Sequence, residues 1–128
     1  MNDHKSKTIE VSIAGLEPGM KGVNITFKVM STSEEQSVES FRDDGAHRVL
    51  DAVVGDSTAT VLMPFWDETI DSIKEGETYT LTNGYAGLFK GSLRLHLGKF
   101  GSIASTDAPI DKVNTELDMS TKEFNGSL

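Results

Sequence analysis

The stretch NGYAGLFKGSLRLHLG, residues 83–98, alternates apolar with polar side chains and is interrupted by glycines. Leucines at alternate positions near its end enclose Arg94 and His96, which is the two-residue period of a strand with one buried face. The glycines that flank the segment from Tyr85 to Lys90 let the backbone bend sharply and let a ligand approach it closely. The stretch therefore predicts a β-hairpin that presents rings and cations.

The charge of this hairpin region is opposite to that of the chain as a whole. The 128 residues include 20 Asp and Glu against 12 Lys and Arg, a formal net charge of -8. Residues 78–106 contain Lys90, Arg94 and Lys99 and no acidic residue. A uniformly acidic surface repels nucleic acid. Charges in physiological salt act over only about 8–10 Å, however, so a local basic strip can still bind a polyanion.

Short strands separated by turns make up most of the remaining chain. Residues 23–30 alternate strictly between apolar and polar, and Pro64 predicts a bulge or an edge near the end of the third strand. Ile70 and Ile73 lie three apart after an acidic start, which suits a short helix. We expect strands at 23–30, 47–54, 59–66, 78–82 and 92–98, a short helix at 67–74, and a Ser/Glu-rich loop at 31–40.

This order of elements predicts an all-β fold. Short strands spaced by turns favour a closed barrel over a βαβ arrangement. Five strands in a Greek key, with a helix between strands three and four, are the arrangement of the OB-fold. We expect a flexible N-terminus at 1–8, an OB-fold domain at 9–106, and a polar, acidic and flexible C-terminal tail at 107–128.

Composition and motifs exclude several classes of function. The chain has no cysteine, which excludes a disulfide framework, a zinc finger and a thiol nucleophile. Its histidines are scattered, and it lacks Walker and dinucleotide-binding fingerprints. We therefore expect no catalysis, no cofactor and no metal.

The apolar runs are too short to span a membrane, and the start lacks the apolar core of a secretion signal. We expect a monomer in the cytoplasm, associated with the nucleoid in a prokaryote, and no membrane partner.

Three aromatic residues are candidates for stacking on bases. Trp66 shares one face of its strand with Pro64, opposite an apolar set, while Tyr85 and Phe89 lie on the hairpin. A ring laid against a base contributes on the order of 1–3 kcal/mol with little preference among bases. The alternatives are that Trp66 belongs to the core and that the hairpin rings cover a barrel end. Phe100 is either a further stacking residue or a plug of the barrel.

Cations near these rings are candidates for phosphate contacts. Solvated surface charge is the default for any one of them, but the absence of acids from 78–106 makes the set unusual. Each phosphate neutralised on a single strand adds roughly 0.7 to the salt slope of binding. His96 is a candidate for stacking on a base or hydrogen bonding to its edge, or is simply an exposed histidine. The candidate phosphate contacts are Lys90, Arg94, Lys99, Arg48 and Lys28.

Several segments together resemble a known family. These segments are LEPGMKGVNI at 16–25, VGDSTATV at 54–61, FWD at 65–67, IKEGET at 73–78 and LTNGYAGLFKGSLRL at 81–95. They occur in the same order in the short, single-OB single-stranded DNA-binding proteins of archaea. The pattern also resembles the eukaryotic homologues in DNA-damage complexes and, more distantly, the DNA-binding domains of replication protein A. The resemblance covers about residues 11–103.

The resemblance implies a function and assigns roles to individual residues. In that family the aromatic after strand three and the two hairpin aromatics stack on bases, which are Trp66, Tyr85 and Phe89 here. Some members carry a further aromatic on strand five, where this chain has His96. The implied function is binding of single-stranded DNA with little sequence preference in replication, recombination or repair, with proteins of those processes as partners. An RNA-binding OB protein and an OB module that binds protein are the alternatives.

Overall fold

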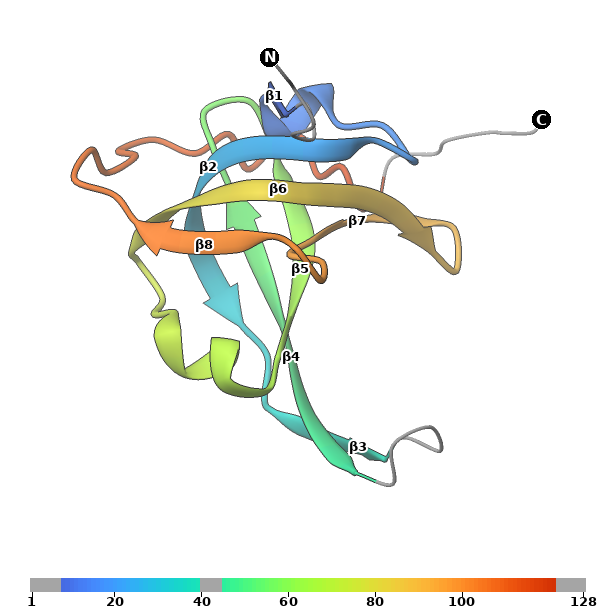
Figure 1. Cartoon of the computed structure of the whole chain (residues 1–128). Coiled ribbons are helices and arrows are strands. Elements are labelled where there is room, and N and C mark those ends of the chain that lie inside the picture. The colour runs from blue at the N-terminus through green and yellow to red at the C-terminus, as the bar shows by residue number, and fades with distance from the viewer. Residues whose placement is uncertain (1–7, 40–44, 122–128) are drawn as a thin grey trace, which may run out of the picture.

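The computed structural model describes residues 8–39 and 45–121. In chain order its elements are β1 Ile9–Glu10, η1 Ile13–Gly15, β2 Lys21–Thr32, β3 Gln36–Glu39, β4 Ala46–Gly55, β5 Thr60–Trp66, η2 Asp67–Ser72, β6 Thr78–Phe89, β7 Ser92–His96 and β8 Ser102–Ser105 (Figure 1). Both helices are of the 3-10 type. None of the helices formed by the described residues is long and apolar enough to span a bilayer.

The strands close into a five-stranded barrel, which confirms the predicted all-β OB-fold. β2 pairs with β4 and also with β6, so the sheet meets itself. β4 continues to β5, and β5 reaches β7 through a short parallel pairing of Leu62 with Arg94. β7 returns to β6 as the hairpin that the glycine-rich stretch predicts. Figure 1 shows η2 beside one end of the barrel, between β5 and β6 in the chain.

The alternation read from the sequence matches the core. Val23, Ile25, Phe27 and Val29 of β2 are all buried. Side chains on a strand alternate between its two faces, so every second residue of β5 and β7 also points inward. These inward side chains join those of β2 in one hydrophobic core. The largest fully buried side chains include Phe27, Phe65, Met63, Leu93 and Leu95. The residues between them on β5 and β7 point outward, and they form the surface described in the next subsection.

One strand is longer than the sequence indicates, and another forms where a loop was expected. β6 runs for 12 residues and includes the glycine-rich segment up to Phe89, instead of ending at residue 82. The expected loop at 31–40 contains β3, which pairs with β4 in an antiparallel hairpin. All four residues of β3 are exposed, so no buried face produces the alternation by which strands are recognised. Figure 1 shows this hairpin projecting from the barrel.

A two-residue turn connects β6 to β7. Lys90 and Gly91 both have positive φ, at 53° and 82°, between the paired residues Phe89 and Ser92. Positive φ at both central positions defines a type I′ turn, whose twist matches that of the flanking strands. Glycine accepts this conformation without penalty, whereas a lysine in it is uncommon. The turn places the Lys90 ammonium group at the tip of the hairpin.

Residues 107–121, the described part of the tail expected at 107–128, run along the barrel and are called the C-terminal strap. Met119 is fully buried, and its N–H donates to Thr60 O at 2.8 Å. Ser120 Oγ donates to Leu93 O at 2.6 Å and accepts from Leu62 N at 2.8 Å. The strap thus bridges β5 and β7, where their own pairing is short. The expectations for 1–7 and 122–128 lie outside the described residues.

Candidate nucleic-acid interface

The outward side chains of β5, β7 and the end of β6 form one continuous surface, which is called the groove. Strand register brings Leu62 of β5 beside Arg94 of β7, and Arg94 opposite Gly87 of β6. His96 is opposite Tyr85 in the same ladder. A cavity of about 300 Å³ opens in the groove. Its lining includes Pro64, Trp66, Thr69, Tyr85, His96 and Gly98.

The rings singled out from the sequence all lie exposed around the groove. Trp66 is 47% exposed, Tyr85 41% and Phe89 51%. Trp66 ends β5 on its outward face, while Phe65 beside it is buried in the core. These exposures exclude the core alternative for Trp66. Single exposed apolar residues are ordinary on a protein surface, whereas several exposed rings gathered on one face are typical of a binding site.

Tyr85 does not stand alone, because it stacks on His96. The two ring centroids are 4.7 Å apart, and the planes differ by 14°. Burial lowers the pKa of His96, and the positive charge of Arg94 lowers it further. The imidazole is therefore neutral at neutral pH, and the pair presents a flat uncharged platform. A base that binds here extends an existing stack.

Arg94 is held within the groove by contacts on several sides. Its guanidinium carbon lies 4.9 Å from the centroid of the Phe89 ring. Its Nη1 is 3.6 Å from Asp51 Oδ1, an acidic group of β4 that sequence reasoning missed. None of the described residues accepts a hydrogen bond from its buried Nε–H. Arg94 consequently supports Phe89, and its charge is shared with Asp51.

The lysines of the hairpin region are more exposed to solvent than Arg94. Lys90 Nζ lies 5.4 Å from the Phe89 centroid at the hairpin tip. Lys99 Nζ lies 5.6 Å from the centroid of Phe100. Phe100 is 79% exposed, so it does not plug the barrel. Both ammonium groups remain on the surface, where they can meet phosphates.

The structure turns Arg48 away from the groove. Arg48 shares the inward side of β4 with Leu50, and beyond the barrel end this side faces η2. Its Nη2 donates to Asp71 Oδ2 and to Asp67 O, both at 2.9 Å, and Nη1 lies 3.4 Å from Glu35 Oε2. The hydrogen bond to Asp71 raises the pKa of Arg48, and it lowers that of Asp71. We therefore withdraw Arg48 as a candidate phosphate contact.

Lys28 also lies outside the groove. It is on the outward side of β2, where it pairs with Gly55 and Thr78. Those partners are the last residue of β4 and the first of β6. Phe89 ends β6, twelve residues long, at the other end. The curvature of the barrel thus carries an outward lysine to a different side of the molecule.

Comparisons with known proteins identify the family and its fold. A family model described as "Single-stranded DNA binding protein Ssb-like, OB fold" matches residues 16–105. The single-stranded DNA binding protein Ssb of Saccharolobus solfataricus is 32% identical over 96 residues, which are 75% of this chain and 64% of that protein. This chain therefore matches less than two thirds of the length of that relative.

Solved structures share the same architecture. A hypothetical protein from Arabidopsis thaliana superposes with a TM-score of 0.78 at 26% identity, over 100% of this chain and 94% of that one. The second OB-fold domain of replication protein A from Methanococcus maripaludis superposes with a TM-score of 0.63 at 16% identity, over 80% of this chain and 100% of that one. At that identity the second likeness concerns the fold alone.

Proposed function

We propose that this chain, which belongs to the Ssb-like family of OB-fold single-stranded DNA-binding proteins, binds single-stranded DNA along the groove with little sequence preference. The observation that carries the proposal is the set of three half-exposed rings on one face. Single strands expose the faces of their bases, and every base has such a face. Membership in a family of binding proteins supports a role without catalysis.

Rings and cations have separate tasks in the proposed complex. Trp66, the Tyr85–His96 platform and Phe89 stack on bases. Lys90 and Lys99 contact phosphates, with Arg94 as a further charge shared with Asp51. Stacking on several rings supplies affinity without reading hydrogen-bonding edges, which is why little sequence preference follows.

The proposed setting is replication, recombination or repair in the cytoplasm, with proteins of those processes as partners. Support comes from the Saccharolobus relative, which is named a single-stranded DNA binding protein. Single-stranded DNA arises wherever a duplex is opened in these processes. A protein that covers it through stacking and phosphate contacts protects it from nucleases and from re-pairing.

Trp66 provides a direct test because it is the only tryptophan in the chain. Adding oligo-dT at low salt should quench its fluorescence, and the quenching should weaken as salt rises. Unchanged fluorescence together with no mobility shift would overturn the proposal. Competition with oligo-U identifies the preferred strand: tighter binding of oligo-U would make the chain an RNA-binding protein instead.

A further inference from the structure

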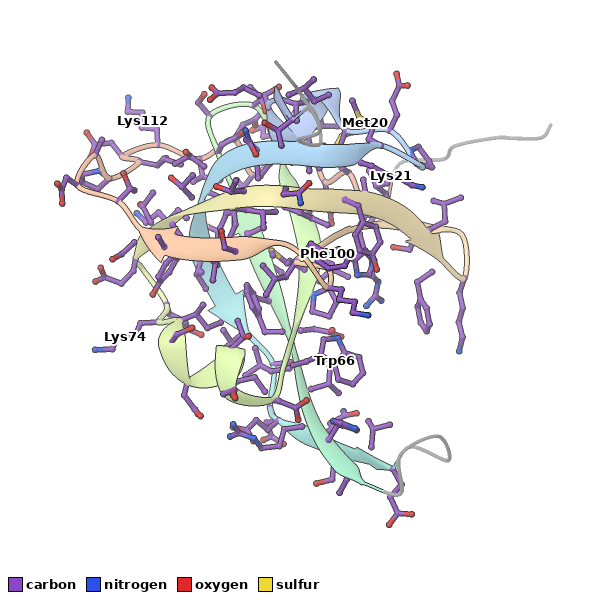
Figure 2. The ribbon with its side chains drawn as sticks, viewed as in Figure 1. Met20, Lys21, Trp66, Lys74, Phe100 and Lys112 are labelled. Atoms are coloured by element: carbon purple, nitrogen blue, oxygen red, sulfur yellow. The ribbon has the colours of Figure 1, made fainter. Side chains whose placement is uncertain are left out.

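A second cavity adjoins the groove at Tyr85, and it is called the Phe100 cavity. Its volume is about 430 Å³, a size typical of pockets that hold small ligands. Tyr85 and Gly98 line both this cavity and the one beside Trp66, so the two are continuous. Figure 2 shows Phe100 between Lys21 and Trp66 on the same side of the molecule. The other side chains of its lining include Lys21, Asn83, Lys99 and Phe100.

The chemistry of this lining matches that of the groove. Phe100 is an aromatic ring with 79% of its surface in solvent, more than any other large apolar residue that the structure describes. Lys21 and Lys99 contribute two cations, and no acidic residue lines the cavity. An exposed ring in a lining that also holds two ammonium groups is what a base and its neighbouring phosphates require.

The backbone holds the Phe100 ring outward. Asn83 Nδ2 donates to Phe100 O at 3.4 Å and so connects the loop to β6. Gly101 approaches the loop so closely that a Cβ there would overlap the Leu97 carbonyl oxygen. Gly98 has a φ of 79° and lies against the Tyr85 ring. The loop from 98 to 101 is therefore fixed beside the groove by contacts at both ends.

We propose that the Phe100 cavity is an additional base subsite, which takes the nucleotide next to the one on Tyr85. Phe100 stacks on that base, and Lys21 and Lys99 meet the phosphates on either side. The inference rests on the proposed function, since it lengthens the path of the same strand. A protein segment is the other conceivable occupant, but continuity with the groove and the pair of lysines favour a nucleotide.

The test compares wild-type protein with the Phe100→Ala variant on oligo-dT of increasing length, from about 4 to 16 nucleotides. Wild type and Phe100→Ala should bind with equal affinity to oligonucleotides that are too short to reach from the groove beyond Tyr85 into the Phe100 cavity. On longer ones the variant should bind about 5-fold or more weakly, as expected when one stack is lost. Phe100→Trp keeps a ring and should retain the affinity, and its added indole should be quenched only by the longer oligonucleotides.

Leu117→Ala is the matched control, because Leu117 is also an exposed apolar residue but lies on the C-terminal strap. It should bind like wild type at every length. Equal binding of Phe100→Ala and wild type at all lengths would overturn the subsite and leave the proposed function intact. An equal loss at all lengths would also overturn it, since Phe100 would then act on the shared part of the groove. Failure of wild type to bind any length would reject the proposed function itself.

Discussion

At the scale of single residues, the groove depends on side chains supported by one another. Tyr85 lies on His96, and Phe89 lies against Arg94. Support of this kind reduces the freedom that a ring loses when a base stacks on it, so more of the stacking energy remains as affinity. Asp51 has the opposite effect, because its carboxylate competes with phosphate for Arg94.

Changing Tyr85 and Phe89 together to Ala should weaken oligo-dT binding by roughly 2–6 kcal/mol if both rings stack. Both side chains are about half exposed, so the fold should survive their removal. Titration followed by anisotropy measures the loss, and circular dichroism checks the fold. A loss below about 0.5 kcal/mol in a folded variant would assign the rings a structural role.

At the scale of elements, the C-terminal strap completes the barrel. The ladder between β5 and β7 contains only the Leu62–Arg94 pair. Ser120 Oγ accepts a hydrogen bond from Leu62 of β5 and donates one to Leu93 of β7, which replaces the missing ladder, and the Met119 side chain is buried in the core. The groove lies on the outer face of these same two strands, so the strap holds together the strands that carry the binding surface.

Replacing Met119 by Ala should lower the free energy of unfolding by about 2–5 kcal/mol, because it leaves a cavity in a close-packed core. Urea denaturation measures the change. Leu117→Ala, two residues earlier and 36% exposed, should change it by no more than about 0.5 kcal/mol. A cost below about 1 kcal/mol for Met119→Ala would contradict the packing of the strap.

At the scale of the whole molecule, the distribution of charge matters more than its sum. The formal net charge is -8, yet no acidic residue lines either the cavity that Trp66 shares with Tyr85 and His96 or the Phe100 cavity. Trp66 also borders a further cavity, whose lining includes Glu39 and Asp67. Arg48 illustrates the other side of this distribution, since its charge is taken up by Asp71 and Glu35 near η2. In the proposed complex, single-stranded DNA therefore meets lysines at the hairpin tip and at the Phe100 cavity, while the acids near its path are Asp51 beside Arg94 and Asp67 beside Trp66.

Lys90→Ala and Lys28→Ala each remove one positive charge, the first beside the groove and the second away from it. Comparing the two variants distinguishes the effect of a charge at the groove from the effect of the net charge. Lys90→Ala should reduce the slope of log affinity against log salt by about 0.7, the value for one phosphate contact on a single strand. Lys28→Ala should leave the slope unchanged. Affinities at several salt concentrations provide both slopes. Equal changes in the two variants would mean that only net charge matters.

The sequence by itself determined the alternation of the strands and, with it, the buried face of the barrel, whereas the core alternative for Trp66 was excluded only by its exposure in the structure. The alternation and the buried face are local, because strand parity depends on a period of two residues. The sequence also predicted the glycine-rich hairpin and the aromatic residues on it. β3 was not predicted, since its exposed residues leave no alternation to read.

Only the tertiary structure decided which outward residues share a surface. Lys28 and Lys90 both point outward, but the closure of the barrel separates them. Arg48 reaches carboxylates that are distant in sequence, so its pairing depends on where η2 packs. The strap and the Phe100 cavity likewise arise from contacts between segments far apart along the chain, and a local pattern carries no record of such contacts.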